Sequence, residues 1–234
     1  MGGVINLKER LEVLKGEILA CCQKAGRKST EVRLVPASKG VESDDLRKAY
    51  DLGLKVFGEN RVQEARVKQP LLPPDIEWHF IGGLQRNKAK EAVRLFALIH
   101  SVDSVELARE LDRRAGESGK VQRILIEVNM GGEASKHGVE PGMAGPLAEA
   151  AWACKNLELS GFMTVAPYEA DLEKVRPYFA GLRMLRDEME AFSGKKLPEL
   201  SMGMSHDYKA AIEEGATIVR VGTALFGARV AAAP

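Results

Sequence analysis

The stretch V-R-L-V-P-A-S-K-G, residues 32–40, joins a strand to an unexpected amine. Its first seven residues are mostly apolar and include β-branched side chains, which predicts a buried strand over Val32–Ser38. Lys39 follows at the point where the strand should open into a turn, and Gly40 comes next. A lysine at the end of a buried strand raises the question of whether its amine has a chemical function.

The rest of the chain repeats a short strand followed by a segment with helical spacing. The predicted strands are Val32–Ser38, Lys55–Gly58, Glu77–Gly82, Ala97–Val102, Val121–Asn129, Glu158–Thr164, Glu199–Gly203 and Ala216–Gly222. Predicted helices include Asp44–Leu52, Val105–Ala115, Glu173–Glu190 and His206–Glu214, with N-caps at Ser43, Asp171 and Ser205 and closing glycines at Gly53 and Gly215. Eight alternations favour a closed (β/α)8 TIM barrel over an open doubly wound sheet, since the first strand lacks G-x-G-x-x-G after it.

The segment before the first strand has the spacing of an amphipathic helix. Its apolar residues recur every three or four positions from Val4 to Cys21, and Gly26 is placed to end the helix. No change of composition marks a linker, and 234 residues are close to the ~250 of a typical barrel. We therefore predict one domain over residues 1–234, with residues 1–30 packing on the barrel as an extra helix.

The composition is that of a globular protein with 45% hydrophobic and 29% charged residues. The formal net charge of +1 gives no electrostatic reason to expect nucleic acid or a membrane as a partner. No apolar run approaches the ~20 residues of a membrane span, and no signal peptide is recognised. The three cysteines and four histidines lack metal-ligand spacing, so we expect no metal and a cytoplasmic location. His79, between Trp78 and Phe80, is assigned to a wall or core position.

Functional residues in such barrels lie at the carboxyl ends of the strands, where Lys39 ends the first strand. An isolated lysine at a strand end is usually solvated. A partly apolar pocket would instead favour the neutral, nucleophilic amine, which forms a Schiff base with a carbonyl compound. The small neighbours Ala37 and Gly40 would leave room for a planar ligand.

Arg220 and a group of small polar residues end the last two strands. By the period of two, Arg220 shares a face with Ile218, and a guanidinium inside the barrel needs either an ion-pair partner or a ligand. Ser205 has the position of an N-cap, yet the loops after the last two strands are also the usual phosphate site of this fold. There Gly222 would let the backbone approach and Thr223 would add a hydroxyl. An amine, an arginine and a phosphate site together fit pyridoxal 5′-phosphate, which has an aldehyde, a ring nitrogen and a phosphate.

Longer motifs surround these residues. They are PASK around Lys39, FGENRVQE at 57–64, WHFIGGLQRNK at 78–88, LIHSVDS at 98–104, LIEVNMGGEASKHGV at 125–139, GFMTVAPY at 161–168 and LSMGMSHDYKAAIEEGATIVRVGTALFGAR at 200–229. Through them nearly the whole chain resembles the YggS/PROSC family of pyridoxal-phosphate-binding homeostasis proteins, whose fold is similar to the barrel domain of alanine racemase. The resemblance implies that Lys39 is the Schiff-base lysine and that Arg220 faces the pyridine nitrogen. It further implies phosphate contacts from Ser205, Gly222 and Thr223 and a lesser cofactor contact from Asn60.

Two positions depart from the pattern of this family. Gly83 stands where a larger residue such as His or Pro is usual, and Gly40 stands where a Thr often follows the lysine. Both glycines would widen the mouth of the pocket, through divergence or through redesign of a natural scaffold, and would weaken cofactor binding. Lys136 matches a family lysine near the mouth, and its role is left open.

The same residues argue for a carrier rather than a catalyst. Catalysis with pyridoxal phosphate needs an electron sink and a positioned acid or base, but an arginine disfavours protonation of the ring nitrogen. None of the four tyrosines lies in a motif typical of the second base of racemases, and we expect no further domain after the last strand to supply one. We therefore expect no catalytic residues and little or no turnover. The expected function is that of a monomeric carrier in vitamin B6 and amino-acid homeostasis, which contacts pyridoxal-phosphate-dependent apoenzymes transiently.

Two other functions stay open. A Schiff-base enzyme, racemase-like or class I aldolase-like, would use Lys39 and the phosphate site for a substrate, although an aldolase would leave Arg220 without a task. An altered scaffold with weakened cofactor binding is the other, supported only by Gly40 and Gly83.

Overall fold

The strands of the protein form a parallel barrel. The structure is a computed structural model that describes residues 6–133 and 137–227. Within these residues an eight-stranded sheet has the order β1-β8-β7-β6-β5-β4-β3-β2. The strands are β1 (Arg33–Pro36), β2 (Val56–Glu59), β3 (Glu77–Phe80), β4 (Leu98–Val102), β5 (Gln122–Glu127), β6 (Leu157–Met163), β7 (Glu199–Ser201) and β8 (Ile218–Val221).

The two outermost strands of this order, β1 and β2, meet at what we call the β1–β2 seam. An isolated parallel bridge joins Ala37 to Gly58 there, and the Ser38 N–H donates to the Gly58 carbonyl at 2.7 Å. The sheet is thereby closed, and the prediction of a (β/α)8 barrel with an additional N-terminal helix is confirmed.

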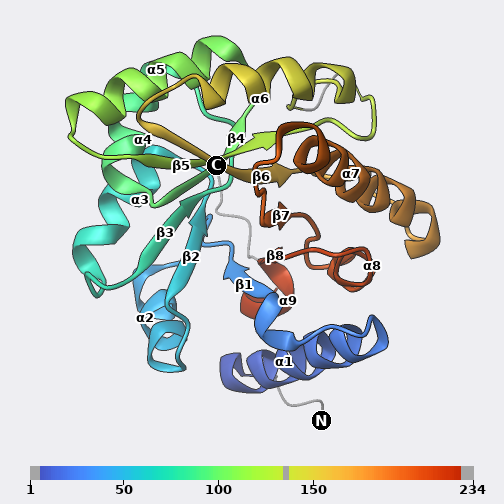
Figure 1. The fold of residues 1–234 in the computed structure, drawn as a ribbon. Coiled ribbons are helices and arrows are strands. Elements are labelled where there is room, and N and C mark those ends of the chain that lie inside the picture. Colours follow the sequence, from blue (N-terminus) through green and yellow to red (C-terminus); the bar gives the residue numbers. More distant parts are fainter. Residues whose placement is uncertain (1–5, 134–136, 228–234) are drawn as a thin grey trace.

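Helices surround the strands on the outside, as Figure 1 shows. They are α1 (Leu7–Lys24), α2 (Ser43–Asp51), α3 (Val62–Lys68), α4 (Ala89–Leu95), α5 (Val105–Glu117), α6 (Ala144–Trp152), α7 (Leu172–Ser193), α8 (Tyr208–Glu213) and α9 (Thr223–Phe226). Each strand predicted from the sequence overlaps an observed one, although most observed strands are shorter because their ends pass into loops at the rim.

The predicted helix caps are only partly correct. Asp171 caps α7 as expected, since its side chain accepts from the Glu173 N–H at 3.0 Å. Ser43 is wrong as an N-cap, because the helix already begins at Ser43 and Glu42 occupies the cap position without a side-chain hydrogen bond. Ser205 is also wrong as the cap of α8, whose N-cap is Asp207.

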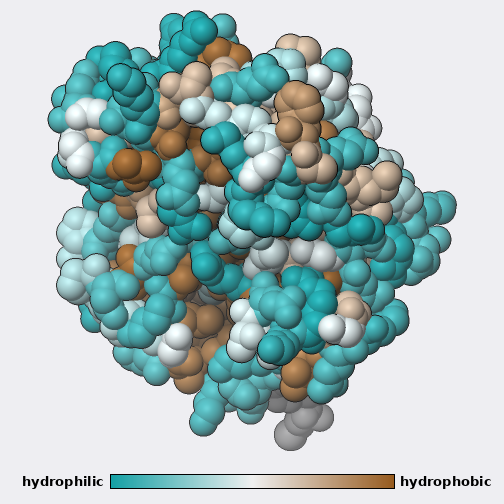
Figure 2. All heavy atoms as spheres, in the orientation of Figure 1, coloured by the Kyte–Doolittle hydropathy of each residue, from teal (hydrophilic) through white to brown (hydrophobic). Residues whose placement is uncertain are grey.

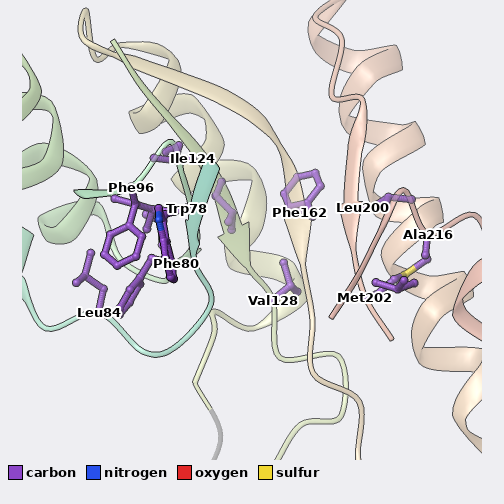
Figure 3. Close-up of a cluster of buried hydrophobic side chains, with 14 of the residues drawn as sticks. Trp78, Phe80, Leu84, Phe96, Ile124, Val128, Phe162, Leu200, Met202 and Ala216 are labelled. Carbon is purple, nitrogen blue, oxygen red and sulfur yellow. The ribbon is translucent and has the colours of Figure 1, made fainter. Parts of the chain in front are cut away.

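Apolar side chains fill two regions. Inside the barrel a small cluster contains Val35, Leu98, Leu125, Met163 and Ile218, all at most 1% exposed. A larger cluster fills the space between strands and helices, and Figure 3 shows part of it, with Trp78 and Phe80 of β3 beside Phe96. The apolar face of each strand that points outward thus anchors the ring of helices.

The N-terminal helix α1 packs against α8 and α9 and lies beside β1 in Figure 1. Its buried face consists of Leu11, Leu14, Ile18, Cys21 and Cys22. These residues belong to the larger core cluster, so the helix is an integral part of the packing. That the whole chain is one domain remains a prediction.

The surface is mixed in character. Figure 2 shows a face that is mostly hydrophilic, with hydrophobic residues in scattered groups. Among the described helices, none has both the length and the apolar character needed to cross a membrane.

Two neighbouring residues of α1 test the packing of this helix. Leu14 is 2% exposed and Val13 is 59% exposed. Leu14→Ala should lower the free energy of unfolding by about 3 kcal/mol, because it leaves a cavity in the core. Val13→Ala should change it by less than about 0.5 kcal/mol. Urea unfolding followed by circular dichroism measures both, and equal effects would contradict the packing of α1 described above.

Candidate functional site

A pocket of about 550 Å³ opens at the carboxyl ends of the strands. Its lining residues are Ala37, Asn60, Ile81, Val165, Tyr168, Met204, Ser205, His206, Arg220, Gly222 and Thr223. Five of the six residues expected to contact a cofactor are therefore brought together by the ends of β2, β7 and β8. The sixth, Lys39, is not in the wall of this pocket.

Lys39 lies in the turn directly after the β1–β2 seam, and its side chain is exposed. Val35 lies in the apolar cluster inside the barrel and Ala37 lines the pocket, so alternation along the chain puts Lys39 on the pocket side. The intervening Ser38 points the other way, where its hydroxyl donates to Glu59. Lys39 therefore stands two residues after Ala37 of the pocket wall, in a turn and with an exposed side chain.

A buried ion pair holds the turn that contains Lys39. Glu59 is 0% and Lys68 9% exposed, and Lys68 Nζ lies 2.8 Å from Glu59 Oε2. Lys68 also donates to the Ser38 carbonyl at 2.7 Å, and Ser38 Oγ donates to Glu59 at 2.7 Å. Glu64 accepts from Lys68 at 2.9 Å and from the Gly40 N–H at 3.2 Å. Both neighbours of the candidate nucleophile are therefore held by one network, which the FGENRVQE motif encodes but sequence reasoning missed.

The two unusual glycines have structural reasons. Gly40 has φ +62°, in the left-handed region, where another residue would cost roughly 1–2 kcal/mol. A Cβ atom on Gly83 would lie 2.9 Å from His137 Nε2, so the imidazole already occupies that space. That Gly83 widens the mouth of the cofactor pocket remains a prediction. Lys136 lies outside the described residues.

Arg220 is 5% exposed and faces the pocket from β8. Its Nη1 donates to Ser201 Oγ at 2.6 Å and its Nη2 to the Thr164 carbonyl at 2.9 Å. In the part of the chain that the structure describes, it forms no ion pair, so the alternative of a structural salt bridge does not hold there. Burial lowers the pKa of Arg220 to about 10, while the carboxyl groups of Glu127 and Asp207 act in the opposite direction.

Ser205 caps the first turn of α9 instead of α8. Its Oγ accepts from the N–H groups of Gly222 at 3.2 Å and Ala224 at 3.3 Å. Thr223, between them, is exposed at the pocket. Two backbone donors that converge on the Ser205 hydroxyl, with the hydroxyl of Thr223 between them in the chain, are the kind of arrangement that binds a phosphate.

A second pocket of about 440 Å³ lies next to the first and shares Asn60 with it. Its wall includes Lys88, Asp103 and His137, and burial raises the pKa of Asp103. In residues 6–133 and 137–227, no group of three or more His, Cys, Asp or Glu side chains is placed to hold a metal ion.

Glu127 ends β5 and is 6% exposed. Burial raises its pKa to about 7, and the nearby charges of Arg220 and His137 only partly oppose this. A buried carboxyl group with a raised pKa near Arg220 was not foreseen from the sequence, because nothing in the LIEVN segment reveals how deeply Glu127 lies.

Removing the cation of the buried ion pair should be costly. Lys68→Met leaves Glu59 buried without its partner, so the free energy of unfolding should fall by about 3 kcal/mol. The exposed pair Lys48–Asp45, with side chains 66% and 52% exposed, provides the control. Lys48→Met should change stability by less than about 0.5 kcal/mol. Similar urea midpoints for the two variants would rule out the supporting role of Lys68.

The raised pKa of Glu127 predicts a pH dependence of stability. The folded protein keeps the Glu127 proton up to a pKa of about 7, whereas an unfolded chain releases it near ~4.3. Between these values the folded state binds more protons, so the free energy of unfolding falls as pH rises and levels off above the folded pKa. Glu127→Gln removes this loss and should be more stable than wild type by up to about 3 kcal/mol at alkaline pH.

Urea unfolding of both proteins across this range tests the Glu127 prediction. The exposed-site variant Glu106→Gln controls for the change in charge. A stability difference between Glu127→Gln and wild type that does not vary with pH would contradict the prediction.

Comparison with known proteins gives a consistent result. The family model described as alanine racemase, N-terminal domain, matches residues 21–230. The pyridoxal phosphate homeostasis protein of Aquifex aeolicus is 50% identical over 226 residues, which cover 96% of this chain and 99% of that protein. The protein of the same name from Bos taurus is 39% identical over 210 residues, covering 84% and 77%.

Solved structures agree with these relatives. PipY of Synechococcus elongatus, determined with PLP bound, has a TM-score of 0.83 and 36% identity, and the match covers 95% of this chain and 100% of that one. An alanine racemase of Clostridium difficile has a TM-score of 0.73 at 14% identity, covering 96% and 57%, and shows the fold alone. The chain therefore belongs to the family of pyridoxal phosphate homeostasis proteins, which share the N-terminal domain fold of alanine racemase.

Proposed function

We propose that this chain binds pyridoxal 5′-phosphate in the pocket at the carboxyl ends of the strands and carries it with little or no turnover. The observation that supports this most strongly is the convergence of a buried guanidinium and a phosphate-type backbone site on one pocket. Arg220 and the Ser205–Gly222 pair line the same cavity. Membership of the family, in which the relative PipY is described with PLP bound, supports the same cofactor.

The residues present fit this cofactor. A volume of about 550 Å³ lies in the ~300–1,000 Å³ range of small-molecule sites. Arg220 has five N–H donors and uses Nη1 and Nη2 for protein partners, so donors remain for a ring nitrogen. The hydroxyls of Ser205 and Thr223 would hold the phosphate, and the Gly222 N–H would join them by exchanging its bond to Ser205 Oγ for one to the phosphate. Asn60, directly after β2, would contact the ring.

Lys39 would provide the covalent attachment. When bound, the cofactor supplies an aldehyde that a lysine amine can attack. The exposed amine has a flexible four-carbon stem, so it can turn from solvent into the adjacent pocket without movement of the backbone. The network of Glu59, Lys68 and Glu64 holds the turn on either side, so that only the side chain needs to move.

The charges of the site favour holding the cofactor over transforming a substrate. A guanidinium beside the ring nitrogen keeps this nitrogen unprotonated, and the ring is then a weak electron sink. We infer a carrier in vitamin B6 and amino-acid homeostasis that acts as a monomer and meets apoenzymes transiently. One observation favours a second candidate, weak racemase-like activity: Tyr168 lines the pocket and packs against His206, with ring centroids 4.8 Å apart and the rings tilted by 40°.

Reductive trapping tests the attachment site. Purified protein incubated with pyridoxal phosphate and then with borohydride should carry the reduced cofactor on the peptide that contains Lys39. Lys39→Ala should lose both this adduct and the visible absorbance band, whereas Lys48→Ala, at an exposed helical site, should keep both. An adduct that persists in Lys39→Ala would contradict the proposal. Trapping with a sugar phosphate but not with pyridoxal phosphate would favour the aldolase alternative.

Turnover is measured separately. The cofactor-loaded protein should racemise alanine no faster than free pyridoxal phosphate does. Robust racemisation that Lys39→Ala and Tyr168→Phe both abolish would overturn the carrier function and establish the racemase-like one.

A further inference from the structure

A chain of hydrogen bonds runs from Arg220 through the interior of the barrel. Ser201 Oγ accepts from Arg220 Nη1 at 2.6 Å and lies 2.8 Å from His100 Nδ1. His100 Nε2 lies 3.0 Å from His79 Nδ1, and His79 Nε2 lies 2.8 Å from Glu77 Oε1. We call Ser201, His100, His79 and Glu77 the interior relay. None of its members lines the pocket, and the function proposed above uses none of them.

The relay crosses the barrel between its two ends. Ser201, His100 and His79 are 0% exposed and come from β7, β4 and β3. Glu77 is the first residue of β3, so it lies at the amino end of the strands, and its side chain is 40% exposed. One end of the relay, Ser201, therefore contacts Arg220 at the pocket. The other end, Glu77, reaches solvent at the amino ends of the strands.

The Arg220 end of the relay is compatible with one direction for all of its hydrogen bonds. Arg220 can only donate, so the Ser201 oxygen accepts from it, and the Ser201 hydroxyl is available to donate to His100 Nδ1. His100 then carries its proton on Nε2 and donates to His79 Nδ1. His79 likewise carries its proton on Nε2 and donates to the Glu77 carboxylate.

The other end of the relay requires the same order. An ionised Glu77 can only accept, which makes His79 Nε2 a donor and, for a neutral ring, Nδ1 an acceptor. The Glu77 end thus specifies two neutral imidazoles in the Nε2–H form, and the Arg220 end is compatible with this state.

The surrounding charges favour that state. Burial lowers the pKa of His79 and, more strongly, of His100. Arg33 and Arg123, at the amino end of the barrel, lower both further, and Arg220 does so for His100. The hydrogen bond from His79 lowers the pKa of Glu77. The hydrogen bond to Glu77 raises the pKa of His79, but the opposite effect of burial is larger.

We propose that Ser201, His100 and His79 are positioning residues, which hold Arg220 as an oriented hydrogen-bond donor toward the ring nitrogen of the bound cofactor. This inference rests on the proposed function. Ser201 and the Thr164 carbonyl occupy one N–H on each terminal nitrogen of the guanidinium, which fixes its plane. The neutral imidazoles keep the Ser201 hydroxyl directed away from Arg220, so that its oxygen lone pair always faces the guanidinium.

The inference is tested by comparing two ligands that differ at one atom. The first is pyridoxal phosphate and the second is its deaza analogue, in which a C–H group replaces the ring nitrogen. Wild-type protein should bind the first at least about tenfold more tightly, the size expected for a hydrogen bond to a charged donor. Ser201→Ala should lose most of this preference, because the guanidinium is no longer oriented, while its affinity for the deaza analogue stays close to that of wild type.

Two further variants control this comparison. Ser160→Ala removes a buried serine of β6 that is 3% exposed and lies outside the relay, and it should keep the preference. Ser201→Thr retains the hydroxyl and should restore the preference. If Ser201→Ala folds and discriminates between the ligands as wild type does, the positioning role is overturned.

The protein without ligand gives an independent readout. Nitrogen-15 NMR of the histidine side chains at neutral pH should show His79 and His100 as neutral Nε2–H tautomers, and His137 and His206 serve as internal references. Ser201→Ala should change the His100 Nδ1 signal, since that atom loses its donor. Protonated imidazoles, or the Nδ1–H form at either site, would overturn the relay.

Different results would overturn cofactor binding and the orientation of Arg220 by the relay. A wild-type protein that binds neither ligand overturns the proposed function, and with it the orientation of Arg220 toward a cofactor, whatever the NMR spectrum shows. Binding of both ligands with equal affinity by wild type overturns the role of Arg220 and of the relay but leaves cofactor binding intact.

Discussion

The structure depends most on how the barrel closes between its first and second strands. A closed sheet leaves no edge exposed, but closure here uses a single bridge from Ala37 to Gly58. There is no room for a side chain at Gly58, where a Cβ atom would lie 2.7 Å from Ile81. The buried pair of Glu59 and Lys68 completes the contact by tying Ser38 to β2. The charged pair thus replaces the ladder of backbone bonds that joins the other strands.

This closure also decides where the amine of the candidate site stands. Lys39 follows the last residue of the seam, so its backbone is fixed by the contacts that close the barrel. The wall next to it, formed by β8 and the loops around it, is fixed separately, by the hydrogen bonds of Arg220 and by the Ser205 cap on α9. A rigid frame with one mobile amine suits a protein that must take up a ligand and release it again, because only a side chain has to reorganise.

The sequence was sufficient to predict the barrel and most of the pocket. Alternation of strand and helix patterns gave the fold, since hydrophobic periodicity reflects burial directly. Asn60, Ser205, Arg220, Gly222 and Thr223 were placed together because the carboxyl ends of parallel strands meet at one rim. The turn that carries Lys39 was found, but the outward position of its amine was not, because a rotamer is not encoded in a local pattern.

Contacts between distant strands could not be predicted from one sequence. Ser205 was assigned to the wrong helix, since its partners Gly222 and Ala224 come from a later segment. His79 was correctly assigned to the interior as a wall or core residue, but its partner His100 lies 21 positions away on the next strand. The pair is recognisable only once strand register is known. The fit of His137 against Gly83 has the same origin.

Hydrogen bonds and an ion pair attach α1 to both ends of α8. Glu17 accepts from Tyr208 and, at 2.7 Å, from Lys209, both at the start of α8. Lys24 pairs with Glu213 at the end of the same helix at 2.8 Å. Because α8 directly follows the loop that holds Ser205, a helix that precedes the first strand supports a wall built from much later segments. On a ribosome, α1 would emerge without these partners and would gain them only once α8 has been synthesised.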